Sequence, residues 1–205
     1  MIMYFCAIIK TTNYMENSNK NHIIYAPVTL DFVTVSVEFC SFLEKTETIS
    51  RKEWIKTVLR ILPLLYVKAT LLPSVEILDE ELSEIFVSEQ DYMLISNQVA
   101  SMLGEEDVYL DVFVVDMKYS DRPVSSFISE DIADIYQDIR NFVSIYQYGL
   151  EESMINALSI CSENFRLYWG QKLVNVLRPL HTLVYKPIDD IDLSHDTREE
   201  ENSWG

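Results

Sequence analysis

Apolar residues return every three or four positions along most of this chain, which is the spacing of one face of an α-helix. The clearest example follows Ser129 and ends before Gly149, a residue expected to terminate the helix. Its apolar positions are Ile132, Ile135, Tyr136, Ile139, Phe142, Val143 and Tyr146. Comparable stripes predict further helices that begin near Pro27, Arg51, Ser88, Glu151 and Gly170.

Polar residues in front of these stripes predict where the helices begin. Ser50 and Glu53 have the spacing of a capping box, in which each side chain binds a backbone N–H at the helix start. Ser88 and Ser129 are expected to cap two later helices through their hydroxyl groups. Pro63 lies inside an apolar stretch, where it is expected to kink the helix or to split it in two.

Two stretches also show the alternation that is typical of a β-strand. Residues 33–39 alternate between apolar and polar side chains, but the helical stripe over 28–42 is longer, so a helix is favoured there. Residues 108–114 alternate as well and predict one extended segment near 107–117. The predicted fold is therefore all-α, an irregular bundle of about six to seven helices with this one extended segment.

A single helical domain is expected over residues 27–186. Residues 1–26 are expected to form a flexible leader or to include residues upstream of the true start of translation, because Met15 is a second plausible first residue. Residues 187–205 are acidic and are expected to form a flexible, solvated tail. The apolar run Met1–Ile9 is much shorter than the roughly 20 residues of a membrane-spanning helix. A cytoplasmic protein without a membrane segment is expected.

The chain is strongly acidic, with 16 basic and 33 acidic residues and a net charge of −17. The imbalance is greatest between Glu76 and Asp138, where the only basic residues are Lys118 and Arg122. Proteins that bind nucleic acid use Lys and Arg to neutralise phosphates, so this charge argues against a nucleic-acid partner. It leaves open an acidic mimic of nucleic acid that would occupy a basic groove on another protein.

Patterns for known catalytic and metal-binding sites are absent from the sequence. There is no glycine-rich phosphate loop, Gly-x-Ser-x-Gly elbow, His-Glu-x-x-His motif or EF-hand loop. No histidine stands in the Glu-x-x-His pattern of a di-iron helix bundle. The cysteines are widely spaced, which favours buried thiols in a reducing compartment: Cys6, Cys40 and Cys161. No cofactor, metal or catalytic residue is expected.

One group of carboxylates stands out, because Asp131, Asp134 and Asp138 share a face of the helix that follows Ser129. Asp134 and Asp138 have no basic residue three or four positions away, so the face is either solvated or paired with a base from another helix. The candidate bases in the last two helices are Arg166, Lys172, Arg178 and His181. We expect Asp138 to meet Arg178 or another of these bases, because an unpaired buried carboxylate is costly. The candidate polar cluster is Asp134, Asp138, Arg178 and His181.

Three segments resemble a bacterial family known as domain of unknown function 5063. They are the stretch Asp131–Asp138, the stretch Phe165–Gly170 with the following Val176–His181, and the opening helix Phe32–Leu43. The resemblance implies a compact, mostly helical protein and no particular activity. It adds two aromatic motif positions, Tyr136 and Trp169, to the candidate cluster. The chain departs from the family pattern at Tyr168 and Lys172, which replace a pair of histidines around the Trp-Gly element.

The sequence favours a non-enzymatic module that binds an unknown protein or a small ligand. An alternative is a metal-dependent or acid/base enzyme that uses Asp134 and Asp138 with Arg178 or His181. That enzyme would need these groups to converge in one pocket. The acidic nucleic-acid mimic is the second alternative.

Overall fold

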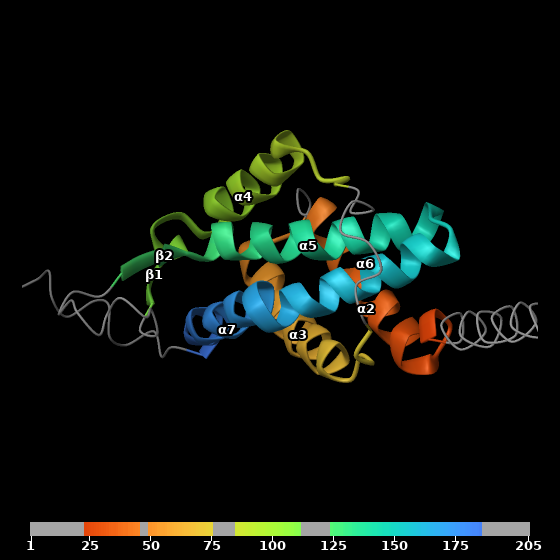
Figure 1. Ribbon diagram of the computed structural model, residues 1–205. Coiled ribbons are helices and arrows are strands. Elements are labelled where there is room, and N and C mark those ends of the chain that lie inside the picture. Colours follow the sequence, from red (N-terminus) through yellow and green to blue (C-terminus); the bar gives the residue numbers. More distant parts are fainter. Residues whose placement is uncertain (1–22, 46–48, 76–84, 112–123, 186–205) are drawn as a thin grey trace, which may run out of the picture.

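Helices make up most of the chain in the computed structural model, which describes residues 23–45, 49–75, 85–111 and 124–185 (Figure 1). The helices and strands are α2 (Pro27–Glu44), α3 (Arg51–Thr70), α4 (Glu89–Leu103), β1 (Val108–Asp111), β2 (Val124–Phe127), α5 (Ile128–Tyr148), α6 (Glu151–Asn164) and α7 (Gly170–Tyr185). The predicted all-α bundle is confirmed. The expected leader and tail fall largely outside the described residues, whereas the acidic stretch from Glu76 to Asp138 is described except for residues 76–84 and 112–123.

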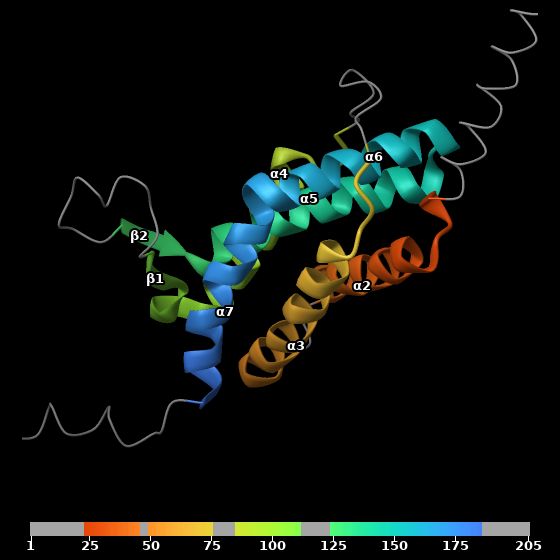
Figure 2. The same cartoon turned by 60° about the horizontal axis from the view of Figure 1, so that its bottom comes forward.

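Fewer separate helices are present in the described residues than the six to seven that the sequence predicts. The reason is that α6 continues through a π-helical turn, Phe165–Trp169, directly into α7. Figure 2 shows these segments as one bent rod. Gly170 follows the π-helical turn at a point where a Cβ atom would collide with the carbonyl oxygen of Phe165. Glycine therefore permits the backbone approach on which this junction depends.

The predicted extended segment is present as β1, within the part of 107–117 that the structure describes. It forms an antiparallel pair with β2, in which Val108 is opposite Phe127 and Asp111 is opposite Val124. The sequence analysis did not anticipate β2, because its four residues are too few to show an alternating pattern. This short pair leads directly into α5 and fixes where that helix begins.

The expected cap of α5 by Ser129 is wrong. The helix begins one residue earlier, at Ile128, and no side chain of its N-cap residue binds the helix start. Instead, the backbone N–H and the hydroxyl of Ser129 donate to the Asp107 carboxylate at 2.8 and 2.6 Å. Asp107 immediately precedes β1, so the acceptor for the helix start comes from a residue distant in sequence, which local spacing could not reveal.

The other local predictions are mostly confirmed. Ser88 and Asp91 form a complete capping box at the start of α4. Ser50 accepts a hydrogen bond from the backbone of Glu53, but the return bond of a full box is not made among the described residues. Pro63 does not split its helix, since α3 runs from Arg51 to Thr70 without a break. Proline removes one backbone hydrogen bond from the helix, while the neighbouring Leu62 and Leu65 remain fully buried in the core.

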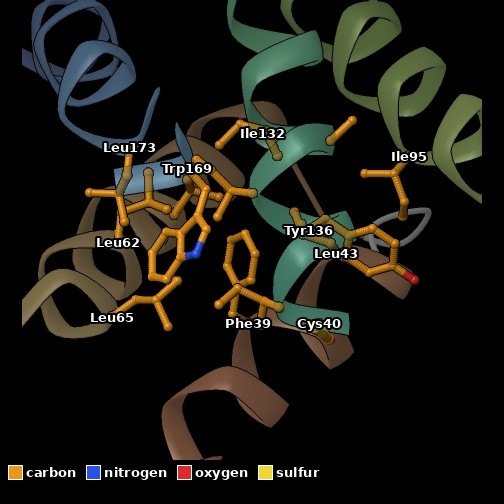
Figure 3. Packing of buried hydrophobic residues seen from close by; sticks show 14 of the residues in the cluster. Phe39, Cys40, Leu43, Leu62, Leu65, Ile95, Ile132, Tyr136, Trp169 and Leu173 are labelled. Carbon is orange, nitrogen blue, oxygen red and sulfur yellow. The ribbon is translucent and has the colours of Figure 1, made fainter. Parts of the chain in front are cut away.

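α5 lies at the centre of the bundle and contacts α2, α4, α6 and α7. Figure 1 shows it between α4 on one side and the rod of α6 and α7 on the other. The indole of Trp169 is fully buried in the core, close to Leu62 and Leu65 of α3 (Figure 3). Its ring nitrogen donates to the carbonyl of Cys161 at 3.0 Å. The core begins before Pro27, because Ile24 is also fully buried and its carbonyl accepts from the Tyr146 hydroxyl at 2.6 Å.

Candidate functional site

The first two carboxylates of the α5 face, Asp131 and Asp134, share one cation, Lys172. The Nζ atom of Lys172 lies 2.7 Å from an oxygen of each carboxylate. The remaining oxygen of each accepts from a tyrosine: Tyr109 donates to Asp131 at 2.5 Å, and Tyr92 donates to Asp134 at 3.0 Å. Asp131 is buried and Asp134 is mostly buried. This arrangement gives every carboxylate oxygen of Asp131 and Asp134 a partner and holds α4, β1, α5 and α7 together.

Lys172 is held in its charged form by this setting. Burial by itself lowers the pKa of Lys172, but the hydrogen bonds and charges of Asp131 and Asp134 more than reverse that effect. The net result is a pKa raised well above the usual lysine value. The ammonium also lies 5.0 Å from the centre of the Tyr168 ring, a cation–π distance. A lysine held so firmly protonated serves as a structural cation and is not available as a base or nucleophile.

Asp138, one turn further along α5, has a different environment. Its Oδ1 atom accepts a hydrogen bond from the Asn164 amide at 2.6 Å, and its Oδ2 atom has no hydrogen-bond partner within the described ranges. Burial raises the pKa of Asp138 to about 6; the hydrogen bond from Asn164 opposes this rise, and the nearby charge of Asp134 adds to it. The expected pairing with Arg178 is wrong, since a neutral amide from α6 takes that place.

Asp138 lines a pocket of about 210 Å³ between α5 and α6. The polar part of the wall adds Gln137, Asn141 and Asn164 to the carboxylate. The Asn141 side-chain oxygen is occupied, because it accepts from the backbone N–H groups of Phe86 and Val87 at 2.8 and 2.9 Å. The apolar part of the wall consists of Ile85, Phe142, Ile145, Ala157, Ile160 and Cys161.

Two members of the predicted polar cluster, Arg178 and His181, are not brought to the carboxylates. Both are exposed on α7, and no hydrogen bond or ion pair joins either to Asp134 or Asp138 in the described part of the chain. The His181 ring instead packs against the Tyr185 ring, with ring centres 4.6 Å apart and the ring planes tilted by 42°. The motif aromatics have structural positions: Trp169 lies in the core, and the Tyr136 hydroxyl donates to Glu44 at 3.0 Å.

The residues that complete the site were only partly visible in the sequence. Lys172 was one of four candidate bases, but nothing in the spacing distinguished it from the other three. Tyr92, Tyr109 and Asn164 were missed, because each lies on a different element from the carboxylate that it contacts. No cluster of three or more potential metal ligands occurs among the residues that the structure describes.

Comparison with known proteins identifies the family. Residues 23–186 match a family described as Domain of unknown function (DUF5063). The chain belongs to this family. The chain is similar to a solved structure, protein BF1032 from Bacteroides fragilis, with 44% identity and a TM-score of 0.71 over 80% of this chain and 97% of that chain. No curated protein matches the sequence.

The DUF5063 match covers every side chain of the pocket and of the Lys172 cluster, from Ile85 to Lys172. The family description names no activity, so the chemistry of the site has to be argued from its geometry. Within the described residues, no helix combines the length and apolar character that would let it cross a membrane.

Proposed function

We propose that this DUF5063 protein is a non-enzymatic binding module that holds a small ligand in the pocket between α5 and α6. The observation that carries the proposal is the position of Asp138. Its carboxylate lines a pocket with an apolar wall, and one of its oxygens has no hydrogen-bond partner in the described chain. Polar groups at fixed positions in a pocket wall are what orient a bound small molecule.

The neighbouring charges support binding rather than catalysis. Asp131 and Asp134 share the Lys172 ammonium, and a tyrosine hydroxyl binds each of them, so both carboxylates are engaged in contacts within the fold. The Cys161 thiol in the pocket wall has its pKa raised by burial and by the charge of Asp138, which keeps it protonated and unreactive. The groups beside the pocket are therefore suited to holding a ligand in place.

An acid/base enzyme is the second candidate, because a carboxyl group with a pKa of about 6 is well matched to proton transfer near neutral pH. Such an enzyme needs a second group in reach of the substrate. The proposed partners, Arg178 and His181, are exposed on α7 and make no described contact with Asp138. The nucleic-acid mimic has less support, since such a mimic needs its carboxylates on the surface. Asp107 and Asp131 are instead buried and accept hydrogen bonds from within the protein.

The proposed setting is the cytoplasm of a bacterium. Its support is that Cys40 and Cys161 are free, buried thiols, which is the usual state of cysteine in a reducing compartment.

Backbone amide NMR with three five-carbon probes tests the binding function: n-pentylammonium, 1-pentanol and pentanoate. We expect saturable shift changes at pocket residues with at least one probe. Ile160→Trp should abolish them, because the larger ring fills a wall position that is only partly buried. The matched control is Met154→Phe, which enlarges an apolar residue on α6 outside the pocket lining and should leave binding unchanged. No saturable shift with any probe would refute the proposed function.

A further inference from the structure

We infer that the ligand of this pocket is a small primary alkylammonium, whose charged group binds Asp138 and whose chain lies against the apolar wall. This inference rests on the proposed function, because it names the chemical class of ligand for the same pocket. It follows from the charges around Asp138, from the hydrogen-bonding groups in the wall and from the size of the pocket.

The first argument is that Asp138 lacks a cation while the cations around it are already committed. Lys172 binds Asp131 and Asp134, the Arg140 guanidinium lies 3.0 Å from Glu44, and the Arg166 guanidinium lies 3.1 Å from Glu163. A mostly buried carboxylate without a counter-ion is costly, and a bound cation would remove that cost. Because no side chain of the described residues supplies a cation to Asp138, a cationic ligand can supply one.

The second argument is that two side chains of the pocket wall, Asp138 and Asn164, each have an acceptor oxygen without a partner in the described residues. Asn164 donates its amide N–H to Asp138, which leaves its carbonyl oxygen without a partner in the described residues. This oxygen and Asp138 Oδ2 both belong to side chains that line the pocket. A primary ammonium carries three donors and no acceptor, so it complements this pair of oxygens. A carboxylate or phosphate ligand would bring further acceptors to the same place.

The third argument concerns size and overall charge. At about 210 Å³ the pocket is smaller than the roughly 300 Å³ at which pockets for drug-sized ligands begin. Phe142, Ile145 and Ile160 supply a wall suited to a short hydrocarbon chain. The net charge of −17 attracts cations and repels anions at long range.

Binding should also depend on pH, because the ammonium pairs with the ionised form of Asp138. Besides Asp138, the titratable groups of this region are Asp134 on α5, Cys161 on α6, Tyr168 in the π-helical turn and Lys172 on α7. Cys161 and Tyr168 have raised pKa values and stay neutral, whereas Lys172 stays charged and paired with Asp134. Between pH 5 and 7.5 the change in affinity should therefore follow Asp138.

The test compares n-pentylammonium, 1-pentanol and pentanoate at pH 7.5, with binding measured by the NMR shifts of pocket amides. We expect n-pentylammonium to bind at least about tenfold more tightly than 1-pentanol, a preference on the scale of one charge-assisted hydrogen bond. Asp138→Asn should abolish this preference without weakening 1-pentanol. Glu130→Gln removes an exposed charge from the same helix and should change ammonium affinity less than about twofold, since exposed charges act weakly.

A second measurement uses the unaltered protein, so it does not depend on how Asp138→Asn folds. Ammonium affinity should fall at least about fivefold from pH 7.5 to pH 5, while 1-pentanol affinity should stay constant. If the alcohol binds as tightly as the ammonium, or if pentanoate binds most tightly, the inference is overturned and the proposed function stands. If none of the probes binds, both are overturned.

Discussion

The two ends of the acidic face of α5 lie two helical turns apart and have opposite environments. Asp131, at the first end, is paired with Lys172 and accepts a hydrogen bond from the Tyr109 hydroxyl. Asp138, at the other end, has a neutral amide as its partner and borders a pocket. The first carboxylate uses its charge to join elements of the fold. The second carboxylate has one oxygen, Asp138 Oδ2, without a hydrogen-bond partner in the described residues. For this reason the proposed ligand site is placed beside Asp138.

The largest expected effect comes from removing the cation at the first end. Lys172→Met keeps a long apolar stem but leaves Asp131 and Asp134 largely buried without a counter-ion. We expect the free energy of unfolding to fall by about 3 kcal/mol, the lower part of the range for breaking a buried pair, because Lys172 is partly exposed. Urea unfolding at pH 7 measures this loss.

Lys68→Met is the matched control for that substitution. Lys68 also makes a 2.7 Å ion pair, with Asp31, but both side chains are more exposed. The expected loss is below about 1 kcal/mol. Similar losses for the two variants would contradict the view that the Lys172 pair is a buried structural link.

The second prediction concerns the pH dependence that Asp138 imposes on stability. Its pKa of about 6 in the folded protein lies above the value of an unfolded aspartate, so the folded state binds the proton more tightly. The contribution of this group is therefore most favourable below about pH 4 and is lost as the pH rises through 6. By pH 7.5 the loss should reach about 2–3 kcal/mol, since one pKa unit corresponds to 1.36 kcal/mol.

Other carboxylates shift stability in the opposite direction, so the readout is the difference between the protein and its Asp138→Asn variant. The pKa of Asp91 is lowered by its hydrogen bonds to Ser88, and this group favours folding at higher pH. Unfolding measured from pH 4 to 7.5 should show the variant gaining stability relative to the parent as the pH rises. A constant difference across this range would argue against an elevated pKa at Asp138.

A smaller effect is expected from the tyrosine that supports the first end. Tyr109→Phe removes a 2.5 Å hydrogen bond to the buried Asp131 carboxylate, and we expect a loss of about 1.5 kcal/mol. Tyr136→Phe removes a 3.0 Å bond to Glu44, whose side chain is 37% exposed, and should cost about 0.5 kcal/mol. Thermal unfolding of both variants would reveal the difference, and the reverse order would contradict it.

Much of the fold could be read from the sequence because its helices carry long apolar stripes. The stripe from Ile132 to Tyr146 identified α5, and it also placed the three aspartates on one face. Asp107 could not be identified as the acceptor at the start of α5, because that contact depends on the pairing of β1 with β2. Local spacing carries no information about such contacts.

The partner of the carboxylates could not be chosen from the sequence for a geometrical reason. Lys172 and Arg178 are six residues apart on α7, which places them about 120° apart around a helix with 3.6 residues per turn, so they face different neighbours. Which of them faces α5 depends on the rotation of α7, and the π-helical turn at Phe165–Trp169 changes that rotation. A single additional residue in one turn rotates the following helix by about 100°. In the structure, Lys172 is the base of α7 that contacts the carboxylates of α5.

The smallest predicted effect is the energetic coupling between Asp138 and Arg178, which are not in contact in the described residues. Asp138→Asn and Arg178→Gln should change the free energy of unfolding additively, with a coupling below about 0.5 kcal/mol, because Arg178 is exposed and makes no described bond to Asp138. The corresponding cycle with Asp131→Asn and Lys172→Met should show a coupling above about 1 kcal/mol, because those groups are in direct contact. Urea unfolding of the six variants at pH 7.5 measures both cycles. A larger coupling for Asp138 with Arg178 than for Asp131 with Lys172 would mean that a protein cation already neutralises Asp138, and a cationic ligand would then have no unsatisfied charge to bind.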